Sequence, residues 1–151
     1  MKDNSMKKNS ALMYKIGFVL NIVILTIASL AVIQSVIFMI FASEIFNYFK
    51  DMLPVVIEAK TISIFGTIGC AAYGYLLVLS IVLLVLSIRA RKSLETDDTN
   101  TSPHVLMIIF GVFAIAGLFG IFYLLGGVFG LVENNNLQQQ KAIAQASQNN
   151  E

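Results

Sequence analysis

The stretch IGFVLNIVILTIASLAVIQSVIFMIFA, residues 16–42, decides the fold class. It runs for 27 residues without Asp, Glu, Lys, Arg or His. A helix needs about 20 apolar residues to cross the hydrocarbon core of a bilayer. Lipid offers no hydrogen-bond partner to the backbone, so a segment of this kind pairs its own N–H and C=O groups by forming a helix. We therefore expect residues 16–42 to form a transmembrane helix.

Two further runs, residues 61–88 and 105–132, have 28 residues each and share this lack of ionisable side chains. The sequence thus predicts an all-α integral membrane bundle of three long transmembrane helices, without a soluble domain, in the cell membrane. Of the 151 residues, 57% are hydrophobic and 13% charged, with a net charge of +1. These values exclude an ordinary soluble domain and a nucleic-acid binder. The connecting parts are an N-tail (1–15), two loops (43–60 and 89–104) and a Gln/Asn-rich C-tail (133–151) that we expect to be mobile.

The third run has an alternative. Twenty-eight residues make one tilted helix of about 42 Å or two halves of about 21 Å, and neither half would cross a core of roughly 30 Å. We favour a single span. The alternative is a re-entrant segment that bends near residues 117–120.

The distribution of Lys and Arg predicts the orientation. The N-tail holds four, the loop 89–104 three, the loop 43–60 two and the C-tail one. Cytoplasmic flanks carry the excess of positive charge, so we place the N-tail and the loop 89–104 in the cytoplasm. Three spans put the C-tail outside the cell, whereas a re-entrant third segment returns it to the cytoplasm.

Small and polar residues recur along one side of each run. Membrane helices approach closely where such residues line the contact, so we expect these stripes to pack together. On the third run the stripe is also a candidate surface for homo-oligomers. The predicted packing residues are Asn21, Ala28 and Ser35 in the first run, Gly66, Cys70 and Gly74 in the second, and Ala116, Gly120, Gly127 and Gly130 in the third.

Reactive chemistry is sparse. The runs lack the ionisable residues that pumps and transporters use, and we find no catalytic pair or metal-ligand spacing. The lone Cys70 allows no intrachain disulfide, and we expect His104 to be a solvated residue at a helix start. The sequence therefore predicts no enzyme, no cofactor and no metal site. Arg89, Arg91 and Lys92 are orientation determinants that can also hold anionic lipid headgroups.

The third run, with Ile121-Phe-Tyr-Leu-Leu-Gly-Gly127 inside it and the basic loop Arg89–Lys92 before it, resembles the last two spans of a family of small Gram-positive membrane proteins. These proteins have about four spans and no known function. The resemblance implies a bacterial multi-span membrane protein and carries no catalytic residue. This chain departs from the family in having too few residues for two full spans there and in its Gln/Asn-rich tail.

The expected function is that of a non-enzymatic membrane interaction protein: an accessory subunit, an envelope-stress factor or an immunity-type protector. Its expected partners are membrane lipids and another membrane protein or a second copy of itself, with no nucleic acid. The alternative is a small oligomeric channel or holin-like pore, with Asn21, Gln34 and Ser35 as the polar groups that could face a lumen. A membrane enzyme or transporter has the least support.

Overall fold

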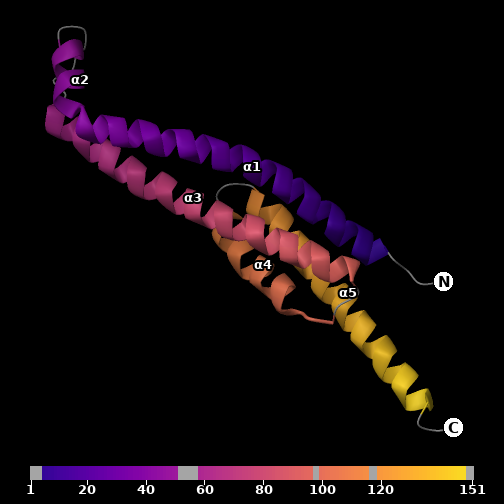
Figure 1. The fold of residues 1–151 in the computed structure, drawn as a ribbon. Coiled ribbons are helices and arrows are strands. Elements are labelled where there is room, and N and C mark those ends of the chain that lie inside the picture. The colour runs from indigo at the N-terminus through magenta and orange to yellow at the C-terminus, as the bar shows by residue number, and fades with distance from the viewer. Residues whose placement is uncertain (1–4, 51–57, 97–98, 116–118, 149–151) are drawn as a thin grey trace. The chain divides into compact units, whose positions relative to one another are not determined.

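The computed structural model describes residues 5–50, 58–96, 99–115 and 119–148. These four ranges contain helices and no strand, which confirms the predicted all-α class. The helices are α1 (Ser5–Ile40), α2 (Ala42–Phe49), α3 (Ala59–Glu95), α4 (Ser102–Phe113) and α5 (Phe119–Gln148) (Figure 1).

Helices α1 and α3 are long and apolar enough to cross a membrane. They have 36 and 37 residues, which corresponds to about 54–56 Å at a rise of about 1.5 Å per residue. Helix α1 contains residues 16–40 of the first apolar run and begins earlier, at Ser5, whereas α3 contains the whole second run and continues to Glu95. Both helices are therefore longer than the hydrocarbon core of a bilayer, about 30 Å thick.

The prediction of a third transmembrane helix is wrong. Residues 105–132 fall into two helices, because α4 ends at Phe113 and α5 begins at Phe119. The N–H of Ala114 still bonds to the carbonyl of Phe110 at 3.0 Å and so closes the last turn of α4. The 12 residues of α4 span about 18 Å, well short of a core of roughly 30 Å. The run is therefore divided between the short helix α4 and the first part of α5, and a single span over residues 105–132 does not form.

Glycines allow α4 and the first part of α5 to fold back on each other. A Cβ at Gly120 would collide with the carbonyl groups of Gly111 and Ala114. At Gly111 it would lie 2.9 Å from the backbone nitrogen of Leu124, and at Gly127 2.8 Å from the carbonyl oxygen of His104. Side chains at these positions would hold the backbones apart. Helices α4 and α5 thus form a tight hairpin.

The chain divides into two compact units. Unit 1 comprises Met1–Ile22 and Ile81–Glu151, and unit 2 comprises Val23–Ser80. The described part of unit 1 contains the start of α1, the end of α3 and the α4–α5 hairpin. Its largest buried side chains are those of Tyr14, Leu83, Met107, Phe119 and Tyr123.

Unit 2 is built on close contacts between the second part of α1 and the first part of α3. A Cβ at Gly66 would lie 2.7 Å from the backbone nitrogen of Met39 and 2.8 Å from the carbonyl oxygen of Ser35. The unit also contains α2, in the loop predicted at residues 43–60. Tyr48 of α2 is 71% exposed and meets the ring of Phe49 edge-on.

The C-tail differs in part from the expectation. Helix α5 continues without a break to Gln148, and it buries Glu133, Asn134 and Leu137 within unit 1. The side-chain amide of Gln138 then donates a hydrogen bond to the carbonyl of Thr99 at 3.1 Å. The following described residues, 139–148, are exposed. The first part of the tail is therefore docked, and the rest of the described tail is an exposed helix.

Candidate functional site

The candidate site lies in unit 1, where the start of α1 meets the α4–α5 hairpin. The Tyr14 hydroxyl lies 2.8 Å from Nδ1 of His104, and the two rings stack with centroids 6.0 Å apart. One turn earlier, the Ser10 hydroxyl donates a hydrogen bond of 2.8 Å to the carbonyl of Gly126. Tyr14 and Ser10 are 0% exposed, and His104 is 1% exposed. We call these three residues, with the Gly126 carbonyl, the polar latch.

A second polar contact lies two turns further along α1. The Asn21 side-chain amide donates a hydrogen bond of 3.2 Å to the Tyr123 hydroxyl of α5. The hydroxyl of Ser87, on α3, faces the same Tyr123 hydroxyl. Asn21 and Tyr123 are both 0% exposed. This contact therefore connects all three parts of unit 1: α1, α3 and the hairpin.

Glycines make room for the rings of this site. A Cβ at Gly126 would lie 2.7 Å from the Tyr14 ring, and one at Gly130 would collide with the His104 ring. At Gly17 a Cβ would lie 3.0 Å from the Tyr123 ring. Gly130, predicted as a packing residue, lies on α5 against the His104 ring of α4.

The environment of His104 favours the neutral imidazole. Burial lowers the pKa of His104 below its usual value of 6.5, because desolvation disfavours the charged form. A neutral ring can accept the Tyr14 proton at Nδ1, which leaves the ring proton on Nε2. The expectation of a solvated His104 is thus wrong. Its ring is a buried partner of Tyr14, and the contact holds the hairpin against α1.

A buried amide lies beyond the polar latch on α5. Asn134 is 2% exposed, and its Nδ2 and Oδ1 atoms have no hydrogen-bond partner among the residues that the structure describes. The neighbouring Glu133 is 6% exposed. The sequence analysis did not select either residue, because both follow the last apolar residue of the run and were assigned to the tail.

The predicted packing residues of the first run are all buried: Asn21 in unit 1, Ala28 and Ser35 in unit 2. Ser35 contacts the second run, since a Cβ at Gly69 would lie 2.6 Å from its Oγ. In the second run Gly66 is buried, Cys70 is half-buried and Gly74 has nothing within 4 Å of a Cβ position. In the third run Gly120, Gly127 and Gly130 are buried, and Ala116 lies outside the described residues.

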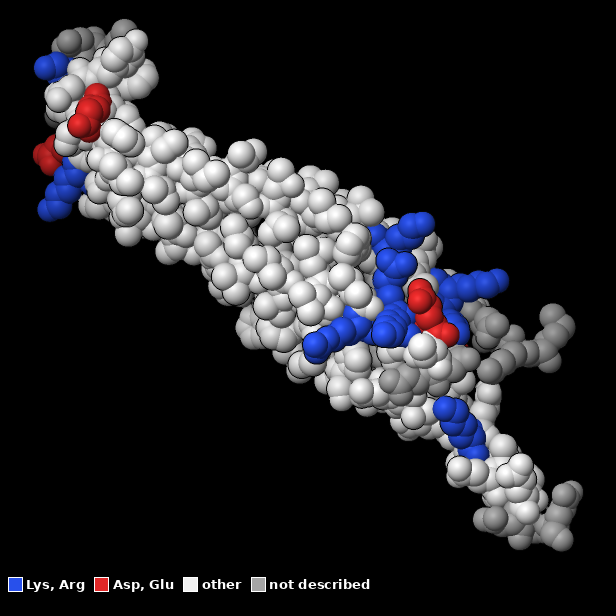
Figure 2. Space-filling view, in the orientation of Figure 1, with Lys and Arg blue, Asp and Glu red and all other residues white. Residues whose placement is uncertain are grey.

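The basic residues predicted to set the orientation lie at the end of α3. Arg89 and Lys92 are exposed and Arg91 is half-buried. Arg91 and Lys92 line a shallow hollow of about 390 Å³ with Ile88 and Glu95. Figure 2 shows basic side chains gathered over the part of unit 1 where α1 begins and α3 ends. The described basic residues of this unit are Lys7, Lys8, Lys15, Arg89, Arg91, Lys92 and Lys141.

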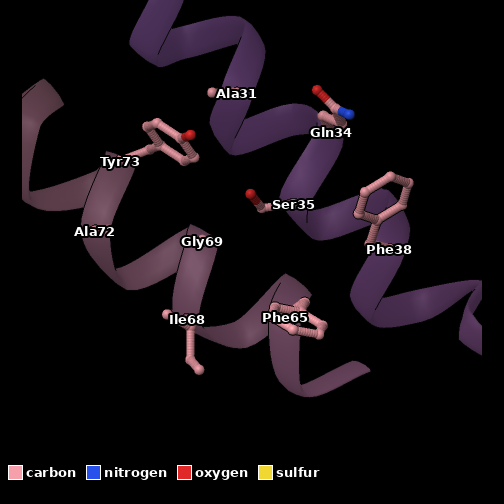
Figure 3. A pocket seen from close by; sticks show the side chains of 9 residues that line it. All are labelled: Ala31, Gln34, Ser35, Phe38, Phe65, Ile68, Gly69, Ala72 and Tyr73. Atoms are coloured by element: carbon pink, nitrogen blue, oxygen red, sulfur yellow. The ribbon is translucent and has the colours of Figure 1, made fainter. Parts of the chain in front are cut away.

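Unit 2 has a groove between its parts of α1 and α3, with a volume of about 390 Å³. Figure 3 shows Ser35 pointing across to α3 near Gly69, with Gln34 and Phe38 on the α1 side and Phe65 and Tyr73 on the α3 side. Ala31, Ile68 and Ala72 complete the lining. The groove is mostly apolar and carries one amide side chain.

The polar side chains of the polar latch and of the Asn21–Tyr123 contact bond to one another or to the backbone in pairs. Within the described ranges, no three His, Cys, Asp or Glu residues lie close enough together to hold a metal ion. The Tyr14–His104 pair is covered by protein, which excludes direct access of a substrate in this conformation. The arrangement can therefore fix one helix against another, and in the structure this is what its contacts do.

Comparisons of the chain with protein-family models, with curated proteins and with solved structures find no match. The resemblance to a Gram-positive membrane protein family stays a prediction.

Proposed function

We propose that this chain is a non-enzymatic integral membrane protein that acts by binding another membrane protein, as an accessory, envelope-stress or immunity-type factor. One observation carries the proposal. The groups that could do chemistry in unit 1, Tyr14, His104 and Tyr123, are buried and engaged with one another or with Asn21. The groove of unit 2, in contrast, opens on an apolar surface that includes an amide. The accessible groups of the groove, apolar side chains and one amide, are thus suited to binding another protein within the membrane.

The proposed topology has two spans, α1 and α3, and a re-entrant α4–α5 hairpin. The apolar part of α5, residues 119–132, would extend about 21 Å, so both arms of the hairpin are shorter than a core of roughly 30 Å. A hairpin of this length enters and leaves on one side. The predicted extracytoplasmic C-tail depended on three spans, and we now propose a cytoplasmic C-tail. Eight of the ten Lys and Arg residues then lie in the cytoplasm, as the positive-inside rule favours.

Thiol labelling in intact cells tests this topology. In a Cys70→Ala background, cysteine at Ser5 or Gln145 should resist a membrane-impermeant maleimide, because both sites lie on the cytoplasmic side. Cysteine at Tyr48, 71% exposed on α2, should react. All three should react after the membrane is permeabilised. Labelling of Gln145→Cys in intact cells, with Ser5→Cys protected, would contradict the re-entrant hairpin.

Photo-crosslinking tests the interaction function. A benzophenone amino acid at Phe65, which lines the groove and is 66% exposed, should form adducts with a protein in living cells. The matched control is the same amino acid at Ile33, which is 57% exposed and does not line the groove. Adducts with protein at Phe65 and not at Ile33 are the expected result. Lipid adducts alone at both positions would contradict a protein-binding groove.

The alternative, a small channel or holin-like pore, predicts ion flux. Purified chain in liposomes should leave a potassium gradient intact if the interaction proposal is correct. Rapid loss of the gradient at low protein-to-lipid ratio would favour the pore. Asn21 and Ser35 are buried against other parts of the chain, so opening a lumen lined by them would require these contacts to separate.

A further inference from the structure

The groove of unit 2 leaves the amide of Gln34 exposed. Gln34 lies on the α1 side of the groove, one turn before Phe38 (Figure 3), and its side chain is solvent-accessible in the structure. No hydrogen bond joins this side chain to the described part of the chain. The residue belongs to the uncharged run 16–42 of a helix that is long and apolar enough to span a membrane.

An exposed amide at this position is costly in a membrane. A glutamine side chain offers two N–H donors and a carbonyl acceptor, and lipid chains can pair with none of them. Polar side chains within membrane helices therefore hydrogen-bond across to another helix. The folded monomer supplies such a partner to Asn21, through Tyr123. The described part of the monomer offers no such partner to Gln34.

We propose that a second copy of this chain covers the groove, with the two Gln34 amides hydrogen-bonded to each other across a twofold axis. The inference rests on the proposed function, since it names the partner that the groove binds. An amide is self-complementary, because each copy can donate through its N–H group and accept through its carbonyl oxygen. A twofold interface brings the same patch of both copies together and places residues near the axis opposite themselves.

The lining of the groove fits this partner. Ala31 and Ala72 are small, which permits close approach of a second helix. Phe38, Phe65 and Tyr73 surround the small residues with large apolar surface. A helix of a second copy would thus gain packing contacts around the central amide pair.

The glycine-rich third run, the surface expected from the sequence to support homo-oligomers, is occupied within the monomer. Gly120 contacts the end of α4, Gly127 contacts His104 and Ile108, and Gly130 contacts the His104 ring. These glycines offer no close-approach surface to another chain. Self-association through the groove of unit 2 does not compete with these contacts.

Dimerisation of the full chain in liposomes tests the inference. Single-molecule photobleaching over a range of protein-to-lipid ratios gives the dissociation constant. Gln34→Leu keeps the side-chain size and removes the amide, and we expect it to weaken dimerisation about five- to thirtyfold, the equivalent of about 1–2 kcal/mol. The control is Ile33→Leu, because Ile33 lies about 100° around the helix from Gln34. This variant should leave the dissociation constant of the dimer unchanged. A monomeric wild-type chain, or a Gln34→Leu constant equal to that of wild type, would overturn the inference.

A second variant keeps the test valid if Gln34→Leu loses its helical circular dichroism. Ala72→Leu fills the groove from the α3 side without altering the amide, and it should also weaken dimerisation. If it does not, the second copy does not occupy the groove. The Phe65 photo-crosslink separates this inference from the proposed function. An adduct at twice the mass of the chain supports both, an adduct with a different protein supports only the proposed function, and lipid adducts alone contradict both.

Discussion

Replacing Gly130 by alanine should destabilise unit 1, although alanine is the better helix former. A Cβ at Gly130 would lie 2.7 Å from Cε1 and 2.9 Å from Cγ of His104. The ring has little room to retreat, because it is 1% exposed and stacks on Tyr14. A shift of the ring would also lengthen the 2.8 Å contact between its Nδ1 and the Tyr14 hydroxyl.

The expected magnitude follows from these contacts. Overpacking a buried site costs about 1–3 kcal/mol, and a weakened hydrogen bond adds about 0.5–1.5 kcal/mol. Alanine returns about 1 kcal/mol through its higher helix propensity. We therefore expect the free energy of unfolding to fall by about 0.5–3.5 kcal/mol. The matched control is Gly74→Ala, because Gly74 is also helical and a Cβ there meets nothing within 4 Å. This control should be neutral or should gain up to about 1 kcal/mol.

The assay is reversible unfolding of the purified chain in mixed detergent micelles, followed by circular dichroism. Cysteine labelling at Thr99 reports separately on opening of the region next to the hairpin, and Gly130→Ala should accelerate it. If Gly130→Ala is as stable as Gly74→Ala, His104 does not pack against Gly130, and the arrangement of the polar latch is incorrect.

Two more predictions concern the polar latch. Tyr14→Phe removes the hydroxyl that pairs with His104 and should lower the free energy of unfolding by about 1–3 kcal/mol. The control Tyr48→Phe, at a residue that is 71% exposed, should leave it unchanged. Equal effects of the two variants would contradict the Tyr14–His104 contact. Burial lowers the pKa of His104, so the unfolded chain binds a proton more readily than the folded one. The contribution of His104 to stability is therefore complete above pH 6.5 and is lost as the pH falls through the lower pKa of the folded state. The free energy of unfolding should be lower at pH 5 than at pH 7.5. In His104→Gln this difference between the two pH values should be smaller. If it is unchanged, groups other than His104 cause the pH dependence.

The sequence was sufficient to predict the two helices that are long and apolar enough to cross a membrane. The runs 16–42 and 61–88 lack charged residues over lengths sufficient to cross a bilayer, and α1 contains residues 16–40 of the first run and α3 the whole second run. Hydropathy did not predict where α1 begins, because the first turns of this helix are polar. They are helical in the structure, where Ser10 and Tyr14 contact the hairpin.

The break in the third run depends on backbone distances that hydropathy does not report. A single tilted helix and a hairpin have the same composition. The hairpin requires the backbones at Gly111, Gly120 and Gly127 to approach the facing helix closely, and these positions have glycine. The sequence showed where small residues lie, but it did not show whether they contact another part of the same run or another helix.

The candidate site left one sequence signal unused. Asn21, Ala28 and Ser35 recur at intervals of seven, and the same interval leads back to Tyr14. Extending the stripe into the N-tail would have placed a tyrosine on the buried face of α1. Its partner could not be found in this way, since His104 is 90 residues away in the chain.

The same stripe explains why Gln34 remains exposed. Successive residues of a helix lie about 100° apart around its axis, so a helix rotated to bury Ser35 turns the preceding side chain to its flank. Ser35 is fixed by its contact with Gly69, and Ala28 is buried on the same line. Rotating α1 to bury Gln34 would expose Ser35 and separate its backbone from Gly66. The exposure of the amide thus follows from the packing of unit 2, and a partner that satisfies Gln34 must approach the groove from outside.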